Sequence, residues 1–261
     1  MTIMAAVATV ERTAEVWARL ESVIDPELDE SVTELGFVTR VGVDDGGHVQ
    51  VDFRLPTYWC AANFAFLMAD DMRIAVAALP WVKKVTVGLG EHMYADEINR
   101  GVAAGLSFQA TFGSEASSGE LEEVRRTFMV KAFQRRQEAL LAYLLDRGHE
   151  AAALLGLTVA ALSTLSCDTA GQRLLARYLE RRSVVDSKHN ELAFVDENGA
   201  LLDAGQIHAY LRALRRVGVN AEFNSALCRG LLATRYGGGC APQAEVKPVH
   251  FVRSIGVARS T

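Results

Sequence analysis

The sequence predicts an α/β (α+β) domain, with a small three-stranded sheet and two helices, over residues 1–113 and a mostly helical domain over residues 114–261. Segments in the first part alternate apolar and polar residues with the period of two that is typical of strands. Between them lies an amphipathic pattern with the period of a helix. In the second part, apolar residues recur mainly at spacings of three and four. A chain of 261 residues is long enough for two modest domains.

Charge is distributed unevenly along the chain. Residues 1–113 contain 8 Lys or Arg and 16 Asp or Glu, a net charge of −8, whereas residues 114–261 contain 19 and 16, a net charge of +3. Binding to a phosphate backbone requires basic groups, so the acidic first part argues against a nucleic-acid ligand. The change in charge also supports a domain boundary near residue 113.

The sequence lacks features of a membrane or disulfide-rich protein. No apolar run approaches about 18 residues, so we expect no membrane span. The first ten residues lack the basic start of a signal peptide, and we expect a cytoplasmic protein. The four cysteines include no Cys-x-x-Cys pair, which argues against disulfides and a closed structural zinc site.

The first domain begins with a helix and an acidic turn. Thr13 is a candidate N-cap for a helix that ends near Ser22, and Pro26 prevents the helix from continuing. We therefore expect residues 25–30, Asp-Pro-Glu-Leu-Asp-Glu, to form an exposed turn. The simplest interpretation is a helix stop with solvated carboxylates.

Two strands, a helix and a third strand follow. A strand containing Val41 and Val43 leads into a turn at 44–47, and residues 49–55 alternate as a second strand. Apolar residues at helical spacing over 61–79 predict a helix, and residues 85–89 predict the third strand. This order predicts helices packed on one face of a sheet.

Cys60 lies at the junction between the second strand and the long helix, in the segment Thr57-Tyr58-Trp59-Cys60. A thiol near a helix N-terminus is a better nucleophile and metal ligand than one in a core. Thiolates bind iron and zinc, but one cysteine cannot fill a coordination sphere. The alternative is an inert buried thiol.

Five features in this order resemble the metal–sulphur cluster assembly factors, the PaaD-like and SufT-like proteins. The resemblance covers about residues 12–90. Its features are Asp25-Pro26-Glu27, the Leu35–Val38 segment, the glycine-turn hairpin, the cysteine after the second strand, and the Ala78–Val85 segment.

The resemblance implies a non-catalytic maturation factor that assists insertion of iron or an iron–sulphur cluster into a client protein. The family cysteine corresponds to Cys60, and the acidic turn corresponds to Asp25 and Glu27, which makes these three the candidate ligands for a transient metal or cluster. Related proteins occur with bacterial multicomponent oxygenases, so the hydroxylase subunit of a di-iron monooxygenase is the candidate client.

The loop departs from the family pattern at three positions. The family has proline and glycine before the cysteine and proline after it, whereas this chain has Tyr58, Trp59 and Ala61. We interpret the two aromatic residues and Thr57 as contacts for a dedicated client, because exposed aromatics are good contact anchors. Alternatively, the aromatics pack on a neighbouring loop.

The second domain is predicted to begin with a linker at 114–119 and a long helix from Glu120 to Asp146. We expect the basic residues on this helix to form a solvated face; the alternative is that they dock on the acidic first domain or on a partner. The remaining expected elements are short helices at 150–157 and 159–165 (the second capped by Thr158), a helix from Asp168 to Arg182, a hairpin at 192–202, a helix from Asp203 to Gly218, a helix from Asn220 to Tyr236, and a mobile tail from about 237.

The role expected for the second domain is client recognition or self-association. Cys228 is interpreted as a core thiol, while Cys240 in the tail is a weak candidate for metal capture. Two alternative functions stay open. The first is a thiol-dependent enzyme, which needs a base beside Cys60; the nearest histidines in the sequence are His48 and His92, and neither is obviously placed to serve. The second is an interaction module in which the cysteine is incidental.

Overall fold

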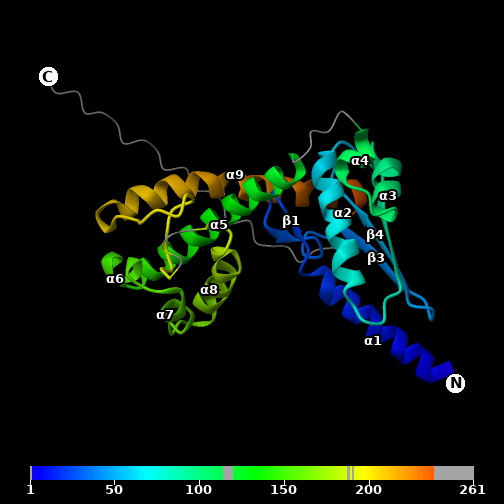
Figure 1. The fold of residues 1–261 in the computed structure, drawn as a ribbon, viewed down its shortest axis with the longest axis horizontal. Helices are drawn as coiled ribbons and strands as arrows, with labels where there is room; N and C mark the ends of the chain where they lie inside the picture. The colour runs from blue at the N-terminus through cyan, green and yellow to red at the C-terminus, as the bar shows by residue number, and fades with distance from the viewer. Residues whose placement is uncertain (1, 114–119, 187–188, 190, 238–261) are drawn as a thin grey trace.

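A computed structural model describes residues 2–113, 120–186, 189 and 191–237. The chain forms a lobe built on a sheet and a lobe built of helices, and the helices α5 (Glu120–Asp146) and α9 (Ile207–Tyr236) run across both (Figure 1). The predicted fold class is therefore confirmed. Among the described helices, none is both long and apolar enough to cross a membrane. The predicted linker and Cys240 lie outside the described residues, and the division at residue 113 stays a prediction.

The three predicted strands form one mixed sheet in the order β3-β4-β5. They are β3 (Val38–Val43), β4 (His48–Arg54) and β5 (Lys84–Gly90). β4 pairs antiparallel with β3 and parallel with β5, so that Val51 lies opposite both Val41 and Val87. Alternate β4 residues are buried, so one face of the sheet packs on the core.

The long helix predicted after Cys60 is α2 (Ala62–Ala77), which connects the parallel strands β4 and β5. The first helix, α1 (Thr2–Leu20), starts earlier than expected. The Thr13 hydroxyl donates to the Thr9 carbonyl within this helix and therefore does not cap it. Two further helices complete the lobe, α3 (Ala95–Ala103) and α4 (Phe108–Phe112).

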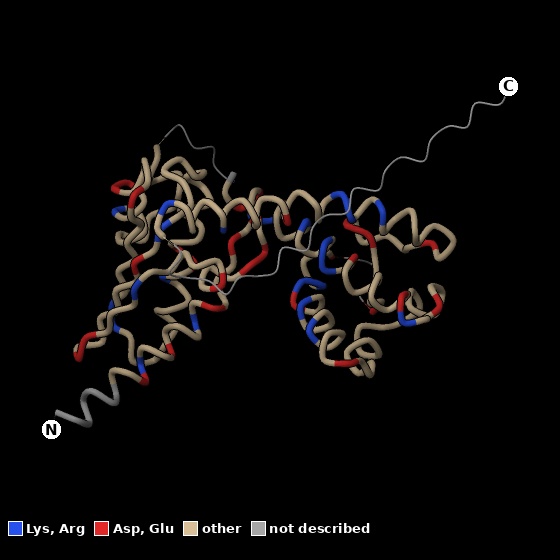
Figure 2. Tube along the Cα trace, turned by 180° about the vertical axis from the view of Figure 1, so that it is seen from behind, with Lys and Arg blue, Asp and Glu red and all other residues tan. Residues whose placement is uncertain are grey.

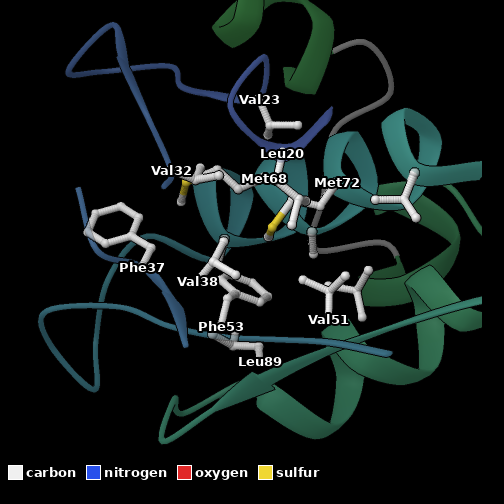
Figure 3. Packing of buried hydrophobic residues seen from close by; sticks show 14 of the residues in the cluster. Leu20, Val23, Val32, Phe37, Val38, Val51, Phe53, Met68, Met72 and Leu89 are labelled. Atoms are coloured by element: carbon white, nitrogen blue, oxygen red, sulfur yellow. The ribbon is translucent and has the colours of Figure 1, made fainter. Parts of the chain in front are cut away.

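The core of the sheet lobe lies between the helices and the strands. Met68 and Met72 of α2 lie between Leu20 of α1 and the sheet residue Phe53, and all four are almost completely buried (Figure 3). This core also includes Leu232 of α9, which is distant in the sequence. The helical part therefore contributes directly to the packing beneath the sheet.

A two-stranded hairpin, β1 (Ile24–Asp25) with β2 (Glu30–Ser31), contains the acidic turn. We call residues 24–31 the acidic hairpin. The expectation that its carboxylates are exposed is wrong for two of them, because Asp25 is 7% and Asp29 5% exposed. Helices from the second half of the chain cover this hairpin.

The helical lobe begins with α5 (Glu120–Asp146), whose bounds match the prediction. Thr158 and Asp168 cap the following helices as expected, since each side chain accepts a backbone N–H three residues later. The other described helices of this lobe are α6 (Ala151–Leu155), α7 (Val159–Ser163), α8 (Thr169–Arg182), the 3-10 turn η2 (Ala204–Gln206) and α9 (Ile207–Tyr236).

Two predictions for this lobe are wrong. Residues 192–202 form no hairpin strands; the Asp196 N–H does donate to the Ala200 carbonyl in a turn, but Phe194 and Val195 are buried among the helices. Gly218 does not end a helix, because α9 continues through it to Tyr236. Gly218 is buried near Arg135 of α5, so tertiary packing favours continuation of the helix there.

Candidate functional site

Cys60 lies just before the N-terminus of α2, in the loop that follows β4. Its side chain is half-buried, and its sulfur is 3.0 Å from the Thr57 hydroxyl oxygen. A hydroxyl in this position donates to a thiolate and accepts from a thiol, so it serves both protonation states. The loop therefore holds one half-buried thiol that packs against the core and has Thr57 as a polar partner.

The segment after β5 holds the Cys60 loop in place. His92, which is 5% exposed, lies with Nε2 at 2.8 Å from the Cys60 carbonyl oxygen, and its Nδ1 accepts the Tyr94 N–H at 3.2 Å. The Met93 N–H donates to the Tyr58 carbonyl at 2.9 Å. Because the carbonyl accepts, Nε2 carries the proton, and both ring nitrogens bond backbone groups instead of the thiol. His92 is therefore a positioning residue.

Four large side chains on the Cys60 loop and on the segment that braces it are exposed to solvent. They are Trp59 (73% exposed), Tyr58 (51%), Met93 (45%) and Tyr94 (38%), which we call the Cys60 patch. Trp59 and Tyr58 do not pack away on a neighbouring loop, as the alternative interpretation required. Exposed aromatic residues beside a reactive group favour contact with a protein partner.

Asp25, the second candidate ligand, is used inside its own turn. Its Oδ1 accepts the N–H groups of Glu27 at 2.9 Å and Leu28 at 2.8 Å. Burial raises the pKa of the Asp25 carboxyl to about 6, although the two N–H bonds oppose this shift. The carboxylate therefore determines the conformation of the acidic hairpin.

Glu27 and Glu30 are bonded to α9. Asn224 donates to Glu27 at 2.9 Å, while Ser225 donates to Glu30 at 2.5 Å. Arg229 forms an ion pair with Glu30. These contacts place one face of α9 directly on the acidic hairpin.

Asp29 is bonded to the helical lobe through Arg136 of α5. Two guanidinium nitrogens of Arg136 lie 2.7 and 2.8 Å from the carboxylate oxygens, and both side chains are about 5% exposed. Arg177 and Arg181 of α8 lie within 3.7 Å of the same carboxylate.

Both predicted alternatives for the basic residues of α5 therefore hold in part: Arg125, Arg135 and Arg136 of α5 bond the acidic first part, whereas Arg126 and Lys131 are exposed. Figure 2 marks the basic and acidic residues along the whole described chain.

Cys228 of α9 is an additional thiol near this site. It packs against the same core as Cys60. Burial, with smaller contributions from the neighbouring Asp25 carboxyl and Cys60 thiol, raises the pKa of the Cys228 thiol to about 11. The structure therefore brings two thiols and the acidic hairpin into one neighbourhood.

The side chains in this neighbourhood do not form a closed metal site. Within the described ranges, no group of three or more His, Cys, Asp or Glu side chains is arranged to hold a metal ion. Asp25 and Glu27 instead make hydrogen bonds within the chain. Chemically, the site offers one half-buried thiol bonded to Thr57, so a metal bound there needs further ligands from outside this arrangement.

Sequence reasoning identified Cys60 and the loop around it but missed His92 as its support and Cys228 as its neighbour. The spacing Ser225, Cys228, Leu232 on α9 is a usable signal, because residues three and four apart share one helix face. Nothing in the local pattern around His92 indicates its contact with a loop 32 residues earlier.

Comparison with known proteins identifies relatives for part of the chain. A protein-family model described as an iron-sulfur cluster assembly protein matches residues 13–87. An uncharacterized protein of Methanocaldococcus jannaschii is 34% identical over 80 residues, which are 31% of this chain and 82% of that protein. The Fe-S protein maturation auxiliary factor YitW of Bacillus subtilis is 35% identical over 68 residues, which are 26% of this chain and 65% of that protein. A crystal structure of a domain of unknown function from Bacillus anthracis is 21% identical, with 43% of this chain and 99% of that chain covered and a TM-score of 0.31.

Proposed function

This chain belongs to the iron-sulfur cluster assembly protein family, and from that premise we propose that it is a non-catalytic maturation factor that assists insertion of iron or an iron–sulfur cluster into a client protein. The observation that carries the proposal is the half-buried Cys60 thiol on a braced loop that, together with the segment bracing it, exposes four large side chains. The Bacillus subtilis relative is named a maturation auxiliary factor, which agrees with this role.

Incomplete ligation suits a protein that transfers its cargo. A thiolate binds iron, but Cys60 and Thr57 leave most of the coordination sphere open. The cargo is therefore held transiently and released when the client supplies more ligands. Asp25 and Glu27 contribute by shaping the acidic hairpin, and they reach the cargo only if their internal hydrogen bonds open.

The Cys60 patch is the proposed client contact. Trp59 and Tyr58 are exposed aromatic side chains within two residues of Cys60, so a client that covers them brings its own ligands close to the sulfur. We propose a cytoplasmic metalloprotein as the client, with the hydroxylase subunit of a di-iron monooxygenase as the first candidate.

The test compares metal loading of the client in the native host. The tagged chain is recovered with its partners by chemical crosslinking and mass spectrometry, and iron in the purified client is then measured after Cys60→Ala. We expect a loss of client iron with Cys60→Ala and no loss with Cys167→Ala, a control at another half-buried thiol. Normal client iron with Cys60→Ala would refute the proposed role.

A pure interaction module is the second candidate function, favoured by the 73% exposure of Trp59. In that case Trp59→Ala abolishes client maturation while Cys60→Ala leaves it intact. The proposed thiol role instead predicts that Cys60→Ala keeps client binding but loses client metallation. Measuring binding and iron content separately distinguishes the two functions.

A further inference from the structure

The outward face of α9 carries an apolar stripe with no partner among the described residues. The stripe consists of Val219 (50% exposed), Phe223 (67%), Leu227 (48%) and Leu231 (37%). Residues four apart lie on the same side of a helix, so these side chains form a continuous ridge. The opposite side of α9 is already used, because Leu232 packs in the first core.

This face is almost free of charge. Between residues 217 and 234, the only charged residues are Glu222 and Arg229. Glu222 pairs with Arg215, and Arg229 pairs with Glu30. Both charges are therefore used within the chain, and contiguous exposed apolar surface of this kind marks an interaction site.

Two small residues lie next to the stripe. Ala226 and Gly230 are exposed, and apart from the adjacent residues and the backbone of the helix itself, no described atom lies within 4 Å of the position that a Gly230 Cβ would occupy. Glycine is a poor residue for a helix interior, and nothing in the described chain requires it here. An open glycine beside a large apolar ridge suits the close approach of a second helix.

We propose that the stripe binds the same stripe of a second copy of this chain, with the two α9 helices antiparallel. The stripe is symmetric about Ser225, because Val219 and Leu231, like Phe223 and Leu227, are equally distant from it in sequence. A two-fold axis level with Ser225 places Val219 opposite Leu231 and Phe223 opposite Leu227. A dimer with two-fold symmetry uses one self-complementary patch in this way.

The pairing also gives the largest side chain a fitting site. In helix packing, a side chain inserts between four residues of the facing helix at positions i, i+3, i+4 and i+7. Phe223 of the second copy faces the group of Phe223, Ala226, Leu227 and Gly230, in which Ala226 and Gly230 leave room for the ring. An uncharged, self-complementary face favours a second copy over a charged client segment.

The proposed contact is one pair of helices, so it lies at the small end of protein interfaces, below about 1,200 Å². We therefore expect a monomer–dimer equilibrium with a dissociation constant on the order of micromolar. Sedimentation velocity of the full chain over about 1 to 200 μM should show a mass that rises from one chain toward two. A single-chain mass at every concentration overturns the proposal.

Point variants separate the interface from the fold. Phe223→Glu should abolish the concentration dependence, whereas Val10→Glu, at a helix residue that is 69% exposed, should not. Gly230→Leu fills open space in the chain, so it should keep or raise the thermal midpoint and still weaken dimerisation at least tenfold. A Gly230→Leu variant that dimerises like the parent chain overturns the proposed packing.

The antiparallel arrangement has its own test. Val219→Glu and Leu231→Lys should each weaken the dimer, because each buries an unpaired charge. When one chain carries both changes, the carboxylate at position 219 of each copy lies opposite the ammonium at position 231 of the other copy. The double variant should therefore dimerise more tightly than either single variant. If the double variant dimerises no more tightly than the single variants, the antiparallel pairing is wrong.

Discussion

Replacement of Asp25 by asparagine should stabilise the protein near neutral pH. The carboxyl is buried, and its Oδ1 accepts the Glu27 and Leu28 N–H groups. Asparagine has the same shape, and its amide oxygen accepts both bonds without carrying a charge. The change therefore removes the cost of a buried charge and keeps the hydrogen bonds of the turn.

The magnitude follows from the pKa of Asp25. Burial raises this pKa from 3.8 to about 6, so the folded chain holds the proton more tightly than the unfolded chain. The free energy of unfolding therefore falls as the pH rises between these two values. A shift of about two units corresponds to about 3 kcal/mol, which is lost above the folded pKa.

Urea unfolding at about pH 4 and about pH 7 tests this reasoning. Asp25→Asn and the parent chain should be similar near pH 4, and the variant should be more stable by about 3 kcal/mol near pH 7. Asp45→Asn, in an exposed turn, is the matched control and should not show this pH-dependent gain. A stability difference for Asp25→Asn that is independent of pH would refute the argument that burial of the charge is the cause.

Three further variants test the structure. Arg136→Ala leaves the buried carboxylate of Asp29 poorly compensated and should lower the free energy of unfolding in urea by about 3 kcal/mol or more. Arg40→Ala, which removes an exposed ion pair, should lower it by less than about 1 kcal/mol. Equal losses in the two variants would contradict this expectation. Gly101→Ala should destabilise the fold by about 1–3 kcal/mol and so lower the thermal midpoint, because an added Cβ collides with Thr111. A higher midpoint would show that the better helix propensity of alanine prevails. Trp59→Ala should leave the unfolding free energy within about 0.5 kcal/mol and abolish co-purification of the client; a large loss of stability would mean that the tryptophan is structural.

Local patterns predicted most of the secondary structure. The alternation in residues 49–55 identified β4, and the helical spacing after Cys60 identified α2, because each pattern records which side of one element is buried. The caps at Thr158 and Asp168 were predictable for a similar reason, since a cap bonds a backbone N–H only three residues away.

Errors occurred where distant packing prevails over local preference. Gly218 resembles a helix stop, but it is buried near Arg135, and α9 continues. Asp25 and Asp29 resemble solvated turn residues, but the helical part covers them. Arg136 is 107 residues from Asp29, so no local pattern predicts their contact.

The sequence by itself determined the fold class, the strand–loop–helix junction at Cys60 and the family to which that junction points. Only the tertiary structure decided what surrounds the thiol. It places His92 beneath the loop, leaves Trp59 exposed, and brings Cys228 close both to Cys60 and to the covered acidic hairpin. The physical reason is that the polarity and spacing of neighbouring residues select each element, whereas contacts between distant segments depend on how those elements pack.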